Sequence, residues 1–222
     1  MRLGIHQPQY MPWLGYLDKI NKCKNFVFLD DVQYKKREFQ NRNRIKTPQG
    51  TMWLTVPVRV KGRYYQNINE VVINNNTNWQ KEHIKAIQHN YSSCRYFEKY
   101  YPLIKEIVMK DWEMLWALNM EVIKFFMKIF KINPPYVMSS DMDIRTTKTR
   151  RLVDMCKKLN ADEYLSGTGA KDYMKENLFR KSGIKLSYQK FKHPEYSQNF
   201  EGFISHLSAL DYLFNCGPNL FN

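Results

Sequence analysis

The stretch RLGIHQPQYMPWLGYLDKINKCKNFVFLDD, residues 2–31, predicts the kind of fold that this chain adopts. It begins with an apolar run over residues 2–5, which predicts a short strand, and continues in a loop whose two prolines exclude helix. Apolar residues then recur at helical spacing from Leu14 to Lys24. Residues 25–30 form a continuous apolar run bounded by polar residues, as buried parallel strands do. The order strand, loop, helix, strand indicates a βαβ unit.

The rest of the chain continues the alternation of strands and helices. Its apolar patterns predict strands at residues 51–58, 68–73, 136–139, 162–165 and 184–191. They predict helices at residues 79–90, 96–108, 111–130, 147–159, 171–182 and 203–215. We therefore expect an α/β fold with a mainly parallel, Rossmann-like sheet. Residues 1–222 are expected to form a single domain, within which residues 79–131 make a helical subdomain.

Positive charge dominates the composition. The chain has 35 Lys and Arg residues against 21 Asp and Glu residues, a formal net charge of +14. The segment from Lys35 to Arg63 holds nine of the basic residues and a single acid, Glu38. Such a balance favours an anionic partner: nucleic acid, a membrane surface or a phosphorylated small molecule. A solvated basic face that only keeps the protein soluble is the alternative, because charge alone identifies no partner.

The composition also limits the class of protein. With 43% hydrophobic and 15% aromatic residues, the chain can bury a core, so extensive disorder is excluded. Its four cysteines form no CxxC pair and no zinc-ligand spacing, which predicts free thiols in a reducing compartment. Neither a signal peptide nor an apolar run of about twenty residues is present. We expect a cytoplasmic protein without a membrane span.

The loop after the first predicted strand is the first candidate site. His6 stands at the carboxyl end of that strand, where open α/β sheets bind ligands. Polar and aromatic side chains alternate densely through the loop, and we expect four of them around the mouth of a cleft: Gln7, Gln9, Tyr10 and Trp13. Gly15, at the start of the next helix, would allow close approach of an anion. The alternative is a rigid hydrophobic plug with His6 in the core.

Asp30 and Asp31 lie at the end of the second predicted strand. Paired carboxylates at a strand end can hold Mg²⁺ or act as a base. Gln33 lies two residues further on and is a candidate substrate-binding residue. An ordinary strand-ending turn or a helix N-cap explains the two acids almost as well.

Amides and arginines alternate in the segment Asn41-Arg42-Asn43-Arg44. The arginine guanidinium offers a planar fork to phosphate or carboxylate, and amides recognise hydroxyl and carbonyl groups. The segment therefore predicts recognition of a polar, anionic ligand. A solvated basic loop is the alternative.

Two later segments complete the candidate residues. Ser166-Gly167-Thr168-Gly169 lies between a predicted strand and a predicted helix, where small residues can offer backbone N–H groups to an anion. It lacks the Lys-Thr ending of a P-loop and the spacing of a dinucleotide fingerprint, and a plain tight turn is the alternative. His193 begins the segment HPEY, which can place a histidine over a cleft or form a turn.

The chain resembles the WbqC-like protein family in several segments that occur in the same order. They are IHQPQYMPWLGYLDKI, FLDDVQY, NRNRI, WLTVPV, YLSGTGAKDYM, YQKFKHPEY and LSALDYLFNCG, and together they span essentially the whole chain. The resemblance implies a role in the biosynthesis of O-antigen or related surface polysaccharides. It implies a transferase that moves a glycyl or similar acyl group onto a nucleotide-linked amino sugar. A fold-level analogy to nucleotidyltransferase-like enzymes suggests ATP and Mg²⁺, although Gln9 and Trp13 do not supply the second histidine of their signature.

On this hypothesis, His6 is the general base or holds the donor, and Asp30 or Asp31 orients it or binds Mg²⁺. Arg42 and Arg44 clamp the phosphates of the sugar nucleotide. The Ser166–Gly169 turn would bind a phosphate or an oxyanion. A nucleic-acid-binding protein that holds a tRNA, or a non-catalytic accessory protein of a glycan pathway, are the alternatives.

Overall fold

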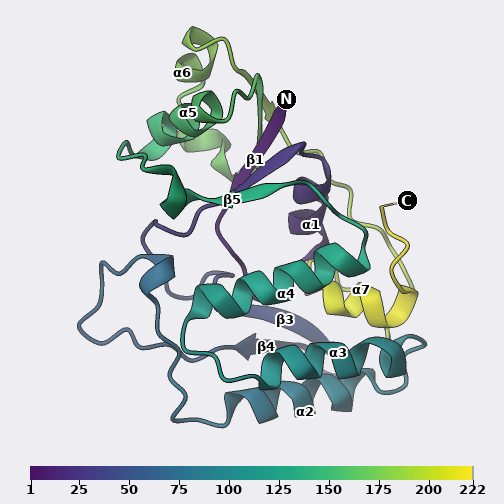
Figure 1. Cartoon of the computed structure of the whole chain (residues 1–222). Coiled ribbons are helices and arrows are strands. Elements are labelled where there is room, and N and C mark those ends of the chain that lie inside the picture. Colours follow the sequence, from purple (N-terminus) through teal and green to yellow (C-terminus); the bar gives the residue numbers. More distant parts are fainter. Residues whose placement is uncertain (222) are drawn as a thin grey trace.

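A parallel sheet organises the computed structural model, which describes residues 1–221 (Figure 1). Its five strands lie in the order β5-β2-β1-β6-β7, and all pair in parallel. The strands are β1 (Arg2–His6), β2 (Asn25–Phe28), β5 (Tyr136–Met138), β6 (Glu163–Ser166) and β7 (Lys185–Tyr188). The predicted α/β fold with a mainly parallel sheet is confirmed.

The direction of the strand order reverses at the middle of the sheet. From β1 the chain moves outward through β2 to β5, and it then returns to place β6 on the other side of β1. In doubly wound sheets such a reversal opens a crevice outside the carboxyl ends of the two central strands. Here these ends are His6 of β1 and Ser166 of β6, so the sheet itself selects where a ligand site can form.

Helices cover both faces of the sheet. Leu3 and Ile5 of β1 point to a core shared with α5 (Lys148–Lys158) and α6 (Glu176–Lys181). The opposite face, with Phe26 of β2, packs on α1 (Leu14–Asn21). Because side chains alternate along a strand, a strand that is buried on both faces needs apolar residues at successive positions. This requirement explains the unbroken apolar runs in the sequence.

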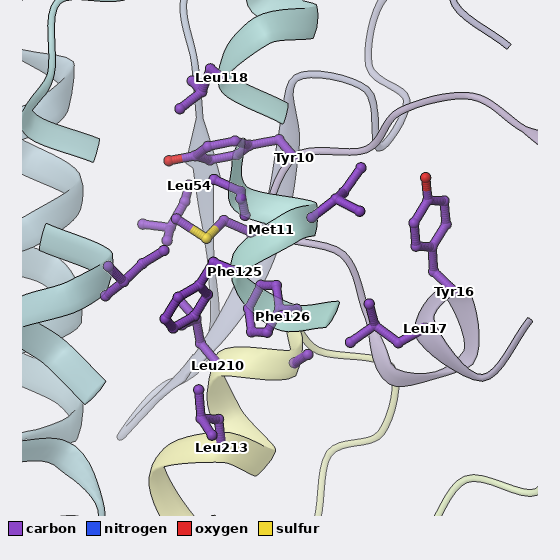
Figure 2. Packing of buried hydrophobic residues seen from close by; sticks show 14 of the residues in the cluster. Tyr10, Met11, Tyr16, Leu17, Leu54, Leu118, Phe125, Phe126, Leu210 and Leu213 are labelled. Atoms are coloured by element: carbon purple, nitrogen blue, oxygen red, sulfur yellow. The ribbon is translucent and has the colours of Figure 1, made fainter. Parts of the chain in front are cut away.

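A second layer lies below the α1 face of the sheet in Figure 1. It contains the antiparallel pair β3 (Arg42–Thr47) and β4 (Gly50–Thr55), with the helices α2 (Trp79–Tyr91), α3 (Phe97–Met109), α4 (Leu115–Ile129) and α7 (Ala209–Cys216). A single cluster of buried side chains joins this layer to the sheet, and Figure 2 shows its centre around Tyr10 and Met11. That residues 79–131 form a separate helical subdomain stays a prediction.

Several predicted elements differ from the structure, among them the helix expected at residues 171–182, which begins only at Glu176, and the helix expected at residues 111–130, which begins at Leu115. The segment expected as a basic loop forms β3, because Asn43 and Ile45 alternate inward and make one face of the hairpin. The strand expected at residues 68–73 is a 3-10 turn, η1 (Ile68–Glu70), closed by a 2.7 Å hydrogen bond from the Asn67 N–H to the Glu70 carboxylate. The last helix begins at Ala209 rather than at residue 203. Two further 3-10 segments follow β5 and β6, namely η2 (Ser139–Met142) and η3 (Thr168–Tyr173).

Within residues 1–221, no helix combines the length and the apolar character needed to cross a membrane. All four cysteines are free thiols, and three of them are buried.

Candidate functional site

A cavity of about 900 Å³ opens at the carboxyl ends of β1 and β6, where the sheet topology predicts a ligand crevice. One wall comes from the end of β1, with His6 and Gln7, and another from the end of β6, with Ser166, Gly167 and Gly169. The structure thus brings together five of the residues that the sequence suggested. A cavity of this size suits a small organic ligand or a nucleotide.

His6 is a neutral imidazole in this cavity at pH 7. Burial and, to a smaller extent, the charge of Lys19 lower the pKa of His6 to about 3. The ring stands edge-on to Tyr16, with a centroid distance of 5.1 Å, and its Nδ1 lies 3.2 Å from the carbonyl oxygen of Gln7. A carbonyl only accepts, so Nδ1 carries the proton and Nε2 keeps its lone pair as an acceptor.

Lys19 is a cavity residue that the sequence reasoning missed. It is 3% exposed, and its ammonium group donates a 2.8 Å hydrogen bond to the carbonyl oxygen of Ile5. Burial lowers the pKa of Lys19 to about 8. Among the residues that the structure describes, no carboxylate forms an ion pair with it. A buried, unpaired ammonium is costly unless a ligand supplies the negative charge or the amine works in its neutral form.

The sequence did contain a signal for Lys19. The residue stands three positions after Tyr16 and four before Cys23, so it occupies the buried face of α1. A lysine at the same helical spacing as the core residues is unusual, because lysine is seldom fully buried without a partner of opposite charge.

The amino end of α5 forms a third wall of the cavity. Lys148, Thr149 and Arg151 line it, and the first turn of α5 carries no acid. The hydroxyl of Thr149 accepts a 3.2 Å hydrogen bond from the backbone N–H of Lys175, another lining residue. Cations at the positive end of a helix dipole are repelled by it, so their clustering there indicates an anionic ligand. This signal was also present in the sequence, as the run KTRR.

The small-residue turn after β6 leaves open space at the cavity. Apart from the glycine and its two chain neighbours, no heavy atom of the described residues lies within 4 Å of the position that a Cβ would take at Gly167 or Gly169. The Ser166 carbonyl accepts a 2.8 Å hydrogen bond from the N–H of Gln189, which fixes the start of the turn against the end of β7. Thr168 is exposed and is not part of the cavity wall.

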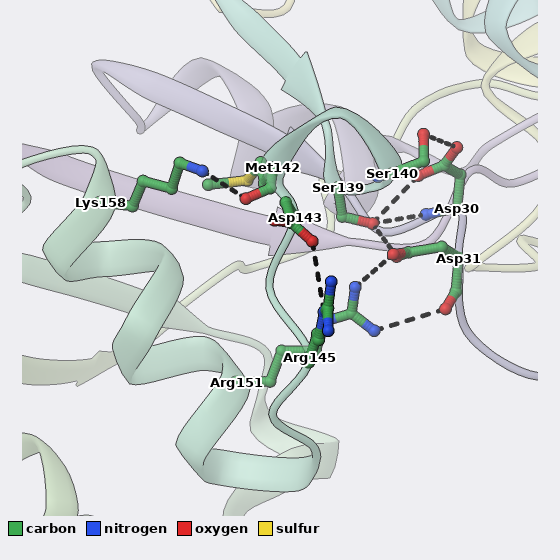
Figure 3. Close-up of polar contacts among 9 residues, drawn as sticks. All are labelled: Asp30, Asp31, Ser139, Ser140, Met142, Asp143, Arg145, Arg151 and Lys158. Atoms are coloured by element: carbon green, nitrogen blue, oxygen red, sulfur yellow. Dashed lines mark hydrogen bonds and ion pairs between the residues drawn. The ribbon is translucent and has the colours of Figure 1, made fainter.

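Asp30 and Asp31 have separate roles (Figure 3). Asp30 is 3% exposed, and its carboxylate accepts hydrogen bonds of 3.0 Å from the Ser140 N–H and 2.7 Å from the Ser140 hydroxyl. The Ser139 hydroxyl lies 3.0 Å from Oδ1 of the same carboxylate. These hydrogen bonds anchor η2 to the end of β2, so Asp30 joins two segments that are distant in the sequence.

Asp31 reaches the cavity indirectly. Its carboxylate forms an ion pair with Arg151, which lines the cavity, and is also in contact with the Ser139 hydroxyl. A second interaction, of 3.4 Å, joins Arg151 Nη1 to the Asp31 carbonyl oxygen. Asp31 therefore orients the guanidinium of Arg151, and the charge that faces the cavity is positive.

A sequence profile of the WbqC-like protein family matches residues 7–222, almost the whole chain. The chain belongs to the WbqC-like family. It is also 37% identical to the uncharacterized protein Rv1507c of Mycobacterium tuberculosis, over 97% of this chain and 94% of that protein. No solved structure matches it significantly. The WbqC-like match begins at Gln7, so it includes the opening loop and the small-residue turn but not His6.

The opening loop of this WbqC-like protein lies mostly inside the core. Tyr10 is 0% exposed, and its hydroxyl lies 3.0 Å from Nδ1 of His83 on α2. Gln9 is also buried. Neither residue lines the cavity, because the chain turns away from it after Gln7 and packs into the second layer (Figure 2).

Trp13 lies outside the cavity as well. Its indole stacks on the His206 ring at a centroid distance of 4.9 Å, and it fills the space beside Gly15. A Cβ at Gly15 would stand 2.1 Å from the Trp13 ring. The expected approach of an anion to Gly15 is therefore wrong, since the indole occupies that space.

The amides of the Asn41–Arg44 segment are structural. The side chain of Asn41 donates a 2.8 Å hydrogen bond to the Val56 carbonyl, and that of Asn43 donates one of 2.6 Å to the Met11 carbonyl. Arg42 and Arg44 point to the opposite face of the hairpin and lie over Trp53. The segment does not line the cavity.

The remaining two candidates also lie elsewhere. Gln33 is exposed and donates a 3.0 Å hydrogen bond to the Tyr64 carbonyl. His193 belongs to an aromatic cluster with His206, 5.2 Å away between centroids, and Phe203, 5.8 Å away. Across the described residues, no group of three or more His, Cys, Asp or Glu side chains is arranged to hold a metal ion.

Proposed function

We propose that this WbqC-like protein binds a nucleotide-linked amino sugar in the cavity and transfers an acyl or aminoacyl group to the sugar amine. The reaction would serve the biosynthesis of surface polysaccharide. One observation carries the proposal: the cavity sits at the switch point of the sheet and is lined by four cations, Lys19, Lys148, Arg151 and Lys175. Glu38 is the single carboxylate among the described lining residues. This charge balance favours a phosphorylated ligand.

The phosphates are assigned to the amino end of α5. There Arg151, oriented by Asp31, offers a rigid fork, and Lys148 and Lys175 add mobile positive charge. The helix dipole adds to the attraction in the same direction. Arg42 and Arg44, which the sequence suggested for this task, are outside the cavity.

Lys19 is the better candidate for the general base. A base works best when its pKa lies near the working pH, and the pKa of Lys19 is about 8 whereas that of His6 is about 3. The neutral Lys19 amine would take a proton from the sugar ammonium, and the freed sugar amine would attack the acyl carbon of an activated acyl donor. The bond between that carbon and the carrier group of the donor would then break, and the carrier would leave with the proton that the new amide nitrogen loses. His6 would orient the sugar by accepting a hydrogen bond at Nε2. The N–H groups of the Ser166–Gly169 turn would face the oxyanion that develops.

Thermal unfolding with a panel of ligands tests the proposal. The panel contains sugar nucleotides with and without an amino group, ATP with Mg²⁺, and inorganic phosphate. At about 100 times Kd, a ligand of the native state adds about 2.7 kcal/mol, which raises Tm by about 5–10 °C for a chain of this size. We expect the largest shift for amino-sugar nucleotides.

Charge reversal then locates the ligand. Lys148→Glu and Lys175→Glu should abolish the shift, since both exposed side chains line the cavity. Lys157→Glu, near the other end of the same helix as Lys148, is the matched control and should keep it. A shift with ATP and Mg²⁺ alone would contradict the amino-sugar proposal and favour nucleotidyl transfer.

A further inference from the structure

The outward face of the β3–β4 hairpin carries an exposed tryptophan flanked by two arginines. Trp53 is 41% exposed, and the guanidinium carbons of Arg42 and Arg44 lie 4.2 and 5.6 Å from its ring centroid. The register explains this grouping, because Arg44 is directly opposite Trp53 and Arg42 is opposite Thr55, two residues further along β4. All three side chains therefore leave the hairpin on the same side.

Packing of the core does not account for this arrangement. The other face of the hairpin supplies the buried side chains, among them Ile45 and Leu54 at 0% and 1% exposure. Trp53 contacts Phe39, 6.1 Å away between centroids, but most of its outer surface has no apolar cover. A tryptophan kept half in water is placed for contact with a partner.

The charge around Trp53 is not neutralised by the protein. No ion pair joins a basic residue of the Lys35–Arg63 segment to a carboxylate in the described part of the chain. Within the described residues the buried Nε atoms of Arg42 and Arg44 have no hydrogen-bond partner, and Nη2 of Arg42 donates to the Arg37 carbonyl, so only the remaining N–H groups can face a ligand. Guanidinium groups stacked on an aromatic ring still present their N–H edges outward, where phosphate can accept them.

Two more exposed aromatic residues lie on a neighbouring loop. Tyr64 and Tyr65 are 71% and 82% exposed. The loop is held against the segment that leads to β3 by hydrogen bonds of 3.0 Å, from the Gln33 side chain to the Tyr64 carbonyl and from the Tyr34 N–H to the Gln66 carbonyl. This loop thus adds two exposed aromatic rings directly after the basic segment that contains the hairpin.

We propose that the outward face of the hairpin, formed by Arg42, Arg44 and Trp53, binds single-stranded RNA, and that Tyr64 and Tyr65 on the neighbouring loop offer further stacking platforms to the same strand. A base stacks on Trp53, and Arg42 and Arg44 contact the flanking phosphates. Stacking platforms spaced among unpaired cations are the means by which proteins hold single strands without reading their sequence. An acidic membrane would use the same charge but needs no stacking geometry, and a duplex hides its bases from Trp53.

The position of this surface links it to the cavity. Glu38 lines the cavity, and the next residue, Phe39, contacts Trp53. An RNA strand on the hairpin would therefore pass close to the cavity mouth, and an acyl group at its end would be within reach. The binding itself does not depend on the acyl transfer proposed above, so the two proposals fail separately.

Fluorescence anisotropy of a fluorescein-labelled, twelve-nucleotide single-stranded RNA tests the proposal. The full chain should bind it with an affinity that falls steeply with salt, because each neutralised phosphate releases counterions. Trp53→Ala should weaken binding about tenfold or more, the usual effect of removing a stacking side chain. The double variant Arg42→Ala/Arg44→Ala should weaken it further, and the salt dependence should fall by about one released ion for each phosphate that the variant no longer neutralises.

The matched control is Arg180→Ala/Lys181→Ala on α6, which removes two charges at the opposite end of the molecule from β3–β4 (Figure 1). It should leave binding unchanged, and every variant should still unfold in one cooperative transition, because each altered side chain is exposed or only partly buried. Equal losses of affinity in the control and the hairpin variants would overturn the proposal, as would equal affinity for duplex and single-stranded RNA. Binding to anionic lipid vesicles without RNA binding would overturn it in favour of a membrane surface.

Discussion

The loops that follow the two central strands, β1 and β6, begin at the same edge of the sheet and have opposite surroundings. After Gln7, the opening loop is buried: Tyr10 and Met11 are both 0% exposed, and the Met11 carbonyl accepts a hydrogen bond from Asn43 of the hairpin. The turn after Ser166 stays open: in the part of the chain that the structure describes, no heavy atom beyond the adjacent residues lies within 4 Å of where a Cβ would stand at Gly167 or Gly169. One loop connects the layers of the fold, and the other forms a wall of the cavity.

This difference shows that many aromatic residues and prolines in a loop indicate a loop that packs against several parts of the fold. They do not by themselves indicate a ligand site. The opening loop spans three surroundings: the cavity at Gln7, the core at Tyr10 and the aromatic cluster at Trp13. Each surrounding demands its own side chain. A ligand wall needs space and backbone groups, which small residues supply without a strong pattern.

The largest effect is expected when the buried loop loses its central side chain. Tyr10→Ala should lower the free energy of unfolding by about 3–5 kcal/mol, because a fully buried ring is replaced by a cavity and His83 loses its partner. Urea denaturation measures this. Tyr65→Ala, with a ring 82% exposed, is the control and should change stability by less than about 0.5 kcal/mol. A decrease below about 1 kcal/mol for Tyr10→Ala would show that the loop is not an anchor.

Much of the fold was predictable because the apolar residues of most strands and helices are the ones that the fold buries. The inner strands β1 and β2 are buried on both faces, and most helices keep their periodicity, so the places of these elements follow from short windows. Strand β3 is one exception. In β3 the inward positions hold Asn43 as well as Ile45, and an amide that satisfies a distant carbonyl gives no apolar signal.

The sequence predicted only those residues of the candidate site that stand at the ends of the parallel strands. His6 and Ser166 end neighbouring parallel strands, so their meeting follows from the sheet. Lys19 and Arg151 come from helices on opposite faces of the sheet, and their meeting depends on packing that no short window contains. The partner of Asp31 was hidden for the same reason.

Substitution of Lys19, a buried residue of the cavity, tests whether the cavity holds an unpaired charge. The folded chain holds Lys19 with a pKa of about 8, against an ordinary value of 10.5. Burying the ammonium therefore costs stability below pH 8. Lys19→Met should then raise the free energy of unfolding at pH 7 by an amount on the order of 3 kcal/mol at most, while it abolishes the ligand-induced Tm shift.

Lys19→Met could also raise stability because methionine packs better than lysine. The direction in which the stability difference changes with pH distinguishes that explanation from removal of a buried charge. Between pH 8 and 10.5 the unfolded chain binds the proton that the folded chain has released, so the parent gains stability as the pH rises. The advantage of Lys19→Met should accordingly shrink over that range, in denaturation curves recorded at several pH values. A constant difference from pH 7 to 10.5 would contradict the unpaired charge.

Glycine-to-alanine substitutions at Gly15, beside the opening loop, and at Gly167, in the turn after β6, compare the two regions most directly. They should have the smallest effects. In Gly15→Ala the new methyl would overlap the Trp13 ring, 2.1 Å away, so the indole must leave its stack on His206. The overlap costs about 1–3 kcal/mol, and alanine returns up to about 1 kcal/mol as the better helix former. A net decrease of about 1–2 kcal/mol in the free energy of unfolding is expected in urea denaturation.

Gly167 provides the other half of this comparison. It has a φ of −71° and open space around it, so Gly167→Ala should stay within about 0.5 kcal/mol of the parent. Because an added methyl projects into the cavity region, it should nevertheless reduce the Tm shift produced by the ligand. Equal decreases in stability at the two glycines would mean that the turn after β6 is packed as tightly as the loop after β1, and the open wall of the cavity would not exist in solution.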